Sequence, residues 1–393
     1  MQPLPEIESP KKFVRDSLTW LGYLLGASFS FCSSSLGPLM PFLRADLHLS
    51  YTQGAYHFSA WALGSLCSGI WGDRLMRIFG RHKTLWGGAI GGCIGVLLIG
   101  TMSQVYLTIF GALTGGFAGS VLGQTVTTIM ADRFGEERAV GITEANISAS
   151  LASFIAPLLV GLCVKMGMPW RLALCFPVAT FFIVFLAFRG KPIPIPAQTE
   201  IEKSGGSLSR TYWIFWTIVT LSVACEWSII FWSSDFLEHS VKLSKADAAE
   251  SVSAFLVAML IGRIIGSRAS LKYSIHTLLG IAAFLAVSGF LAFWLGSNPV
   301  VNLFGLFSCG LGIANFYPLT ISAAIGAADE KTTTATARLS LGTGLATLVA
   351  PFVLGTIADK SDIFVAYGVV ALLLTLCSIM VFVANLHSRR RAQ

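Results

Sequence analysis

The sequence predicts an all-α membrane protein with twelve transmembrane helices, arranged as two pseudo-symmetric six-helix domains. Of its 393 residues, 54% are hydrophobic and 12% are charged, and the mean hydropathy is +0.72. Water-soluble domains carry about 25% charged residues, so this composition indicates a chain that lies in lipid. Apolar runs near the roughly 20 residues that cross a bilayer recur along the whole chain. The two halves also match one another at an offset of 194 residues.

Each of the twelve apolar runs is expected to be a helix. A segment in lipid must satisfy its own backbone donors and acceptors, and the strict alternation of a barrel strand is absent from these runs. The connections between most runs are very short. We place the runs at residues 17–42, 53–73, 84–101, 104–130, 139–163, 170–189, 211–236, 247–267, 275–295, 299–326, 336–358 and 363–387.

The first run is predicted to stay in the protein as an anchor. The preceding stretch "MQPLPEIESPKKFVRDS" is polar, and the run itself is longer than the apolar part of a signal peptide. The eight cysteines all fall inside apolar runs without metal-ligand or redox spacing. We therefore expect small core residues there, with no metal site and no cofactor.

A polar loop divides the chain into six runs on each side. It reads "RGKPIPIPAQTEIEKSGGSLSR" at residues 189–210. We predict an N-terminal domain at 1–189, a central linker at 190–210 and a C-terminal domain at 211–393. The offset of 194 aligns Gly72 with Gly266, Arg74 with Arg268, Gly95 with Gly289, Gly111 with Gly305, Gly116 with Gly310, Pro157 with Pro351, and Gly161 with Gly355.

The distribution of positive charge predicts the orientation. With both termini in the cytoplasm, the cytoplasmic segments hold most of the 27 Lys and Arg residues, as the positive-inside rule requires. This asymmetry accounts for the net charge of +7 without a nucleic-acid partner. The short termini and compact loops favour the inner (plasma) membrane of a prokaryote. The opposite side holds Arg44, Lys165, Arg171, Lys242, Lys245 and Lys360.

The twelve runs, the repeat, the central loop and the stretch "GIWGDRLMRIFGRHK" after the second run together resemble the major facilitator superfamily. The resemblance covers essentially the whole chain and implies two domains that rock about a central site. It further implies a cytoplasmic gate at this loop. The alternative is positive-inside charge without a gating role. The residues that match the motif, together with Gly72 beside them, are Gly69, Gly72, Asp73, Arg74, Gly80, Arg81 and Lys83.

The proposed gate works through Asp73, which can face the positive N-terminus of a helix from the other half. Glu144, near the cytoplasmic end of the fifth run, is expected to form a salt bridge with the cations of the motif. Arg263, in the eighth run, is assigned to gating or packing. The region "ACEWSIIFWSSDFLEHS" and the run after it are somewhat similar to the fucose-permease-like, sugar-type branch of the superfamily.

Two ionisable residues are candidates for proton coupling. Glu226 lies deep in the seventh run, where a carboxylate is costly to place in lipid and is therefore expected to have a function. It could instead be a structural residue paired across helices. His57, in the second run, titrates near working pH and could join a proton relay, whereas a core imidazole is the alternative.

The resemblance also implies a central cavity lined by the first, fourth, seventh and tenth helices. Amides, hydroxyls and aromatic walls on these helices suit a neutral or zwitterionic polar solute. The alternative is that the hydroxyls only tighten helix packing. The candidate substrate-binding residues are Ser30, Ser34, Gln124, Thr128, Trp227, Asn315 and Tyr317.

The function predicted from these features is secondary active transport of a small organic solute by alternating access, with proton-coupled symport favoured. The alternative is proton-coupled export of amphipathic drugs or metabolites. An enzyme is not expected, because nucleophile and metal motifs are absent, and ATP drive is not expected because there is no P-loop. The expected partners are the solute, protons and the lipid bilayer, and the expected state is a monomer.

Overall fold

The computed structural model describes residues 15–134, 138–191, 208–328 and 332–392, which form helices joined by short turns. No β-strand occurs in these ranges. The elements are α1 (Ser17–Leu47), α2 (Tyr51–Thr101), α3 (Val105–Phe134), α4 (Arg138–Lys165), a 3₁₀ turn (Trp170–Leu174), α5 (Cys175–Phe188), α6 (Arg210–His239), α7 (Lys245–Ala269), α8 (Ile275–Leu295), α9 (Pro299–Gly326), α10 (Thr332–Lys360), α11 (Ile363–Ala366) and α12 (Gly368–Ala392).

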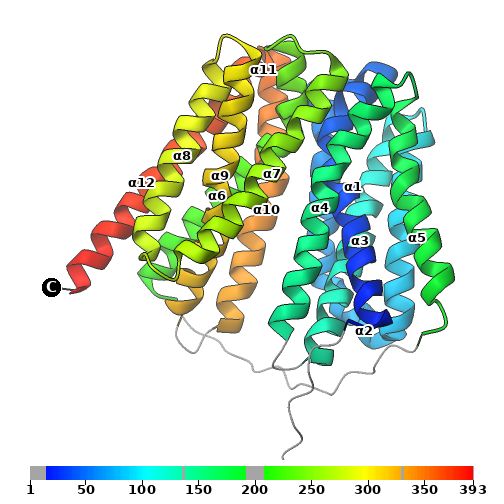
Figure 1. Cartoon of the computed structure of the whole chain (residues 1–393), viewed down its shortest axis with the longest axis horizontal. Helices are drawn as coiled ribbons and strands as arrows, with labels where there is room; N and C mark the ends of the chain where they lie inside the picture. The colour runs from blue at the N-terminus through cyan, green and yellow to red at the C-terminus, as the bar shows by residue number, and fades with distance from the viewer. Residues whose placement is uncertain (1–14, 135–137, 192–207, 329–331, 393) are drawn as a thin grey trace, which may run out of the picture.

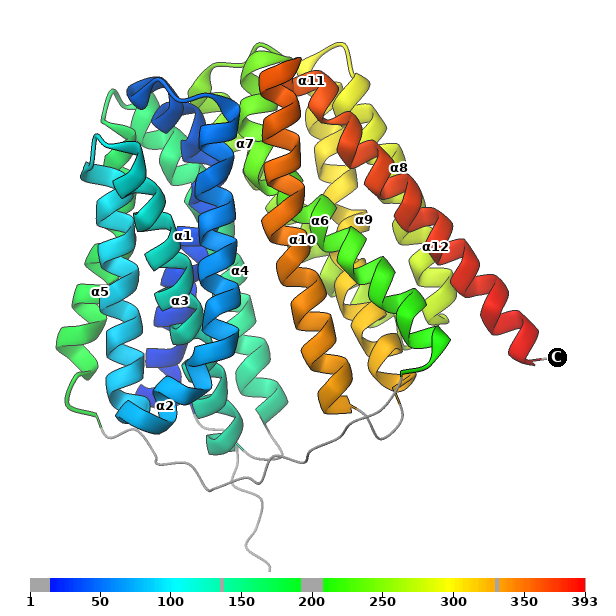
Figure 2. The same cartoon turned by 180° about the vertical axis from the view of Figure 1, so that it is seen from behind.

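The helices form two groups that stand side by side. Figures 1 and 2 show α1–α5 on one side, here called the N group, and α6–α12 on the other, here called the C group. One end of the bundle, where α5 ends at Phe188 and α6 begins at Arg210, is called the linker end. The opposite end, where Leu47 leads into Tyr51, is called the turn end. The ribbons of α4 and α10 stand apart at the linker end in both views.

The chain is an integral membrane protein by the length and apolarity of its helices. Ten described segments, from Tyr51–Thr101 to Ile363–Leu386, are long and apolar enough to cross a bilayer. α1 is not among these ten. The second and third predicted runs both fall within α2, whose 51 residues would extend about 76 Å if straight. The count of twelve crossings therefore stays a prediction.

Gly80 interrupts α2 and lets it fold back. Its backbone has φ 77° and ψ 157°, a conformation that is essentially restricted to glycine. Both arms of α2 pack on the same helix, because Gly64 in the first arm lies against Leu113 of α3 and Gly95 in the second arm lies against Gly111. Gly80 of the motif loop thus forms the turn between the two arms of α2.

Polar residues begin several helices at the turn end. Ser50 starts α2 with a capping box, in which its hydroxyl accepts a hydrogen bond from Gln53 N and the Gln53 side chain accepts one from Ser50 N. Ser244 starts α7 by accepting from Asp247 N. Such caps satisfy the amide groups that a helix leaves without a partner in its first turn. They fix where the two helices begin.

Close glycine contacts hold neighbouring helices together in each group. A side chain at Gly116 of α3 would collide with the backbone of Trp61 in α2. In the C group, a Cβ at Gly310 of α9 would lie 2.7 Å from the carbonyl oxygen of Phe255 in α7. Small residues permit this approach of helix backbones, which drives helix association in membranes.

Candidate functional site

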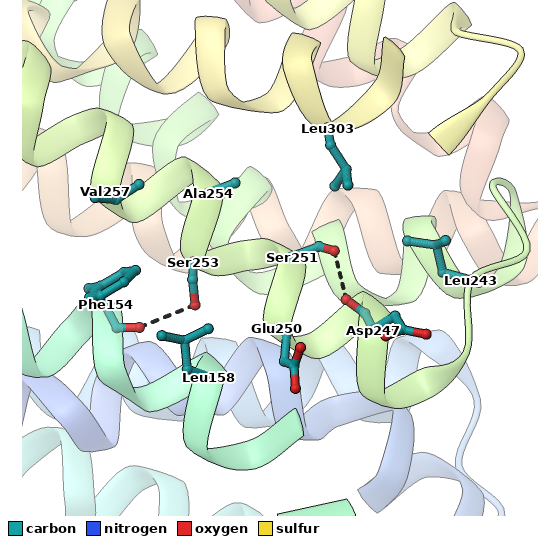
Figure 3. Close-up of a pocket in the computed structure, with 10 residues that line it drawn as sticks. All are labelled: Phe154, Leu158, Leu243, Asp247, Glu250, Ser251, Ser253, Ala254, Val257 and Leu303. Atoms are coloured by element: carbon teal, nitrogen blue, oxygen red, sulfur yellow. Dashed lines mark hydrogen bonds between the residues drawn. The ribbon is translucent and has the colours of Figure 1, made fainter. Parts of the chain in front are cut away.

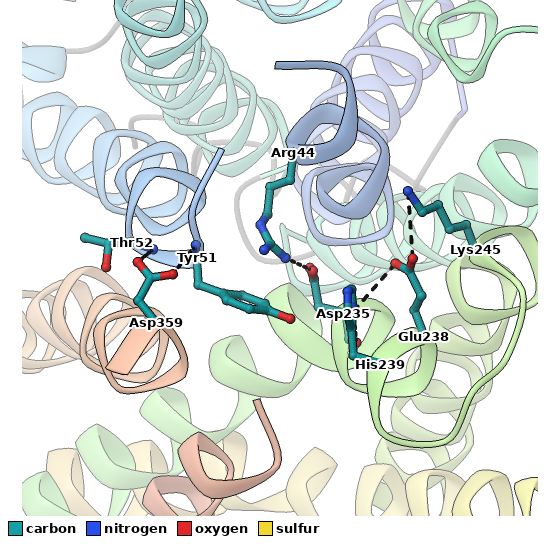
Figure 4. A network of polar contacts seen from close by, with 8 residues as sticks. All are labelled: Arg44, Tyr51, Thr52, Asp235, Glu238, His239, Lys245 and Asp359. Carbon is teal, nitrogen blue, oxygen red and sulfur yellow. Dashed lines mark hydrogen bonds and ion pairs between the residues drawn. The ribbon is translucent and has the colours of Figure 1, made fainter. Parts of the chain in front are cut away.

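A buried ion pair joins the two groups at the turn end. Arg44, in the last turn of α1, pairs through Nη1 with Oδ1 of Asp235, near the end of α6. The Asp235 side chain is fully buried and that of Arg44 is 12% exposed. The Arg44 guanidinium also lies over the ring of Tyr51, with its Cζ 3.5 Å from the ring centroid (Figure 4). Such a pair depends on both members, because removal of one leaves a buried charge uncompensated.

Further titratable groups surround this pair. The imidazole Nδ1 of His239 contacts the backbone oxygen of Asp235 at 3.1 Å. The Glu238 carboxylate lies 3.8 Å from His239 and 3.8 Å from Lys245 of α7 (Figure 4). The turn end therefore carries a compact network of charges.

A second connection at the turn end uses the start of α2. Asp359, near the end of α10, accepts hydrogen bonds from Tyr51 N at 2.6 Å and Thr52 N at 2.7 Å. These amides are unpaired in the first turn of a helix, where the positive end of the helix dipole also favours a carboxylate. Asp359 therefore holds α10 of the C group against α2 of the N group.

A third connection uses the start of α7. Lys165, the last residue of α4, lies 2.7 Å from Oδ1 of Asp247 and 2.7 Å from Oε2 of Glu250. These side chains are partly exposed, so solvent weakens the attraction between them. We call the Asp359 and Lys165 contacts the two flanking latches.

Apolar surfaces close the space beneath the latches. A Cβ at Gly37 of α1 would lie 2.9 Å from the Cα of Phe231 in α6, so the two backbones are in direct contact. The rings of Phe58 and Phe231 stack with centroids 4.3 Å apart and an interplanar angle of 3°. The N and C groups are thus packed tightly toward the turn end.

In the middle of the C group, Glu226 faces a cation. Its Oε1 lies 3.6 Å from Nη2 of Arg263 in α7, and the side chains are 14% and 44% exposed. Tyr317 of α9 is 43% exposed and interacts electrostatically with both residues. The three side chains form a partly open polar cluster on α6, α7 and α9, which we call the central cluster. Arg263, assigned to gating or packing from the sequence, is the partner of Glu226.

His57 lies inside the N group. Its ring is fully buried, with Nδ1 3.0 Å from Gln53 O and Nε2 2.8 Å from Oγ1 of Thr108 in α3. Both ring nitrogens are engaged between α2 and α3. This placement favours the core-imidazole alternative.

The predicted polar residues of the N group take part in helix packing. Gln124 Nε2 donates to Oγ of Ser68 at 3.0 Å, which ties α3 to α2, and Thr128 Oγ1 donates to the Gln124 carbonyl at 2.9 Å. Ser30 is half-buried on α1, and its carbonyl accepts from Ser33 Oγ. Ser34 is buried.

Asn315 and Trp227 are also engaged within the C group. Nδ2 of Asn315 donates to Gly262 O of α7 at 3.1 Å. The Trp227 ring packs against Phe231, with centroids 5.0 Å apart. Of the predicted substrate-binding side chains in this group, Tyr317 is the most exposed.

The motif loop lies at the linker end, and most of its charged residues are exposed. The Asp73 side chain is 65% exposed, and its carboxylate lies 3.5 Å from Arg77, one turn further along α2. Arg81 is buried, and a Cβ at Gly72 would meet the side-chain amide of Gln124. The exposed motif residues include Gly69, Arg74 and Lys83. The sequence-predicted gate residues thus lie along α2 on both sides of Gly80, whereas Glu144 lies on α4.

Glu144 of α4 pairs with the start of α1. It accepts hydrogen bonds from Arg15 at 2.5 and 2.9 Å and from the Tyr23 hydroxyl at 2.9 Å. The hydrogen bond with Glu144 raises the pKa of the Arg15 guanidinium. The expected pairing with the motif cations is thus replaced by a contact between α4 and α1.

A cavity of about 490 Å³ lies between α4 and α7 (Figure 3). It contains none of the predicted substrate-binding residues. Its two carboxylates are those of the Lys165 latch, so it belongs to the contact between the groups. The residues that shape it include Phe154, Leu158, Leu243, Asp247, Glu250 and Leu303.

Sequence reasoning missed Asp235 and the partners of Arg44. Arg44 is recognisable as one of six Lys and Arg residues outside the segments that the sequence predicts to be cytoplasmic. Asp235 sits at the end of the seventh run, nine residues beyond Glu226, and an acid at such a position is typical of the membrane interface. No local signal in the sequence links two residues separated by 191 positions.

Comparison with known families shows the family to which the chain belongs. The family model for the Major Facilitator Superfamily matches residues 22–331 and 216–393. The chain belongs to the major facilitator superfamily. The expectation that it is not an enzyme is thereby confirmed, because the family consists of transporters.

Two curated relatives match part of the chain. An uncharacterised MFS-type transporter of Yersinia pestis is 30% identical over 152 residues, 38% of this chain and 39% of the relative. An uncharacterised transporter of Sinorhizobium fredii is 25% identical over 155 residues, 39% of this chain and 41% of the relative. The chain thus matches about two fifths of the length of these relatives.

Solved structures of MFS transporters share the fold along nearly the whole chain. A nucleoside transporter, NupG, gives a TM-score of 0.78 at 14% identity over 94% of this chain and 100% of that chain. A peptide transporter in complex with sulfate gives 0.78 at 12% identity, covering 97% and 96%. A D-xylose–proton symporter gives 0.72 at 12% identity, covering 93% and 96%.

Proposed function

We propose that this protein is a secondary transporter that moves a small polar organic solute across the membrane by alternating access. The observation that carries the proposal is the asymmetry between the two ends of the bundle. Arg44–Asp235 and the two flanking latches join the groups at the turn end, whereas Asp73 of the motif loop points outward at the linker end. A transporter that exposes its site to one side has this arrangement.

The proposed architecture has twelve crossings in two pseudo-symmetric domains, at 1–189 and 211–393, with a linker at 190–210. The ten apolar segments yield twelve crossings when α2 is divided at Gly80 and α1 is added. Pairs of contacts at the offset of 194 support the symmetry. Gly95 and Gly289 both meet a neighbouring helix backbone, and Lys165 and Asp359 both hold the first turn of a helix in the other group.

The proposed orientation places both termini in the cytoplasm of a prokaryotic inner membrane, as a monomer. The excess of Lys and Arg at the linker end supports it. In that orientation the turn end is the outer face, and the conformation described here is closed outward and open inward. Asp73 then engages the other half only when the linker end closes.

The proposed solute contact is the central cluster. Glu226 and Arg263 offer an acceptor and a set of donors, and Tyr317 offers an aromatic wall with a hydroxyl. A neutral or zwitterionic solute with several hydrogen-bonding groups fits this chemistry. Proton-coupled symport is part of the proposal, with Glu226 as the carboxylate that exchanges a proton with the solute site.

The test is transport by purified protein in liposomes, with sugars, nucleosides, small peptides and lipophilic cations as the panel. We expect uptake of one polar class with proton flux, and we expect Glu226→Gln to abolish the proton flux. Glu144→Gln is the matched control, because Glu144 is held at the linker end by Arg15 and Tyr23. Movement of lipophilic cations alone would favour export of amphipathic compounds, and no movement of any solute would reject the proposal.

A further inference from the structure

We propose that Asp235 is a proton-binding site that controls the turn end: a proton on its carboxylate releases Arg44 and allows α1 and α6 to separate. This inference rests on the proposed transport function. It assigns the control of one gate to a residue outside the central cluster.

The first support is the position of the pair. Asp235 belongs to α6 of the C group and Arg44 to α1 of the N group, so their attraction acts directly across the boundary that must open. The ion pair of the central cluster, Glu226 with Arg263, is partly exposed and lies within the C group. A change of charge on Glu226 therefore acts on the solute site and leaves the boundary intact.

The second support is the incomplete pairing of Asp235. One carboxylate oxygen meets Arg44, whereas Oδ2 is buried and has no hydrogen-bond partner among the described residues. Nε of Arg44 is likewise buried without a hydrogen-bond partner in those ranges. Because buried polar atoms are normally paired, the unpaired carboxylate oxygen beside a single cation is suited to take up a proton.

The surroundings restrict which other groups can respond to pH. Tyr51 of α2 covers Arg44, and Tyr367, between α11 and α12, donates its hydroxyl to Ser233, two residues before Asp235. His239 lies against the Asp235 backbone. The titratable or charged groups that face Asp235 are therefore Arg44, Tyr51, Glu238, His239 and Tyr367, with Lys245 behind Glu238.

The physical consequence of protonation follows from burial. With Asp235 ionised, the two opposite charges stabilise one another in the closed turn end. With Asp235 neutral, the mostly buried Arg44 would lose the carboxylate that it pairs with and keep its contact with the Tyr51 ring, which costs free energy. Opening the turn end hydrates the guanidinium, so the proton shifts the population toward the open form.

Asp359 provides a contrast within the same structure. It also joins the two groups, but it is exposed and its partners are the backbone amides of Tyr51 and Thr52. Its loss should loosen the turn end at every pH. The pH response itself should depend on Asp235.

The decisive measurement is the distance across the turn end as a function of pH, without solute. Spin labels are placed on Gln104→Cys of the N group and Ser297→Cys of the C group, both exposed, after the exposed Cys175 is changed to Ser. In nanodiscs, the wild type is expected to gain a longer-distance population as the pH falls from 8.5 to 5. Asp235→Asn is expected to show the longer distance at every pH.

Two further variants test whether Asp235 itself carries the pH response. The double variant Arg44→Gln/Asp235→Asn removes both buried charges, so it should fold and should also lack the pH response. Asp359→Asn should open more than the wild type but keep the response. The proposal would be overturned if both Asp235 variants kept the pH-dependent change in distance. It would also be overturned if the His239→Gln variant lost this change and the Asp235 variants did not.

Transport then separates this inference from the proposed function. Asp235→Asn is expected to lose proton-driven accumulation and to keep solute exchange between equal concentrations. If the wild type moves no solute, the proposed function fails, while the distance measurement still decides whether Asp235 controls the turn end.

Discussion

Lys165 and Asp359 stand 194 residues apart, and each holds the start of a helix in the other group. Lys165 reaches from the N group to the C group, and Asp359 reaches from the C group to the N group. Lys165, at the end of α4, pairs with Asp247 and Glu250 in the first turns of α7. Asp359, near the end of α10, accepts from the first amides of α2. The two contacts share geometry but not chemistry, because one uses side-chain charges and the other uses backbone donors.

This difference predicts unequal costs for loss of the two latches. Asp359→Asn should lower the free energy of unfolding by about 1 kcal/mol, since a carboxylate at a helix N-terminus is favoured by that order. Lys165→Met should cost less than about 1 kcal/mol, because exposed ion pairs contribute little. Thermal unfolding in detergent measures both, and added salt should reduce the Lys165 effect further. An equal loss in both variants would contradict this assignment.

Gly37 predicts a steric control of the turn end. In Gly37→Ala, the new methyl group would collide with the backbone of Ile230 and Phe231 in α6, so the closed turn end should be disfavoured. A cysteine introduced beneath the turn end should therefore react faster with a water-soluble thiol reagent, and the rate of this labelling is the quantity measured. Gly26→Ala is the matched control on the same helix, because no atom lies within 4 Å of its Cβ. Similar labelling rates in the two variants would remove this role.

Gly80 predicts a backbone requirement in the motif loop. Gly80→Ala places a side chain at φ 77°, which should cost about 1–3 kcal/mol. Gly87→Ala, on the same helix with open space around its Cβ, should be neutral or stabilising by up to about 1 kcal/mol through helix propensity. The midpoints of thermal unfolding compare the two. A Gly80→Ala protein as stable as the wild type would mean that the break in α2 relaxes easily.

Gln124 and Tyr317 predict opposite effects on stability and transport. Gln124→Ala removes the hydrogen bond to Ser68 and should cost about 1 kcal/mol of stability with little change in KM. Tyr317→Phe removes the hydroxyl of an exposed member of the central cluster, so it should raise KM and leave stability unchanged. Parallel unfolding and uptake measurements give both quantities. A raised KM in Gln124→Ala would return Gln124 to the solute site.

Much of the fold follows from the sequence alone. Hydropathy over about 20 residues is a local property, so it located most helices to within a few residues, although the second run ended at residue 73 and the first arm of α2 continues to Gly80. The offset of 194 residues aligns Gly116 with Gly310, and in the structure these glycines meet the backbones of Trp61 and Phe255, which stand at the same offset. The motif loop and the family assignment came from short local patterns, and the family is confirmed.

The tertiary structure alone decided which polar residues meet. The rotation and tilt of each helix determine whether a side chain faces a neighbour, the other group or lipid, and these depend on packing along the entire bundle. Gln124 and Asn315 therefore turned out to be held by adjacent helices, Glu226 met Arg263, and Arg44 met Asp235 across 191 residues. The sequence predicts which charged residues lie in or near an apolar segment. Only the packing of the helices determines which residue each of them contacts.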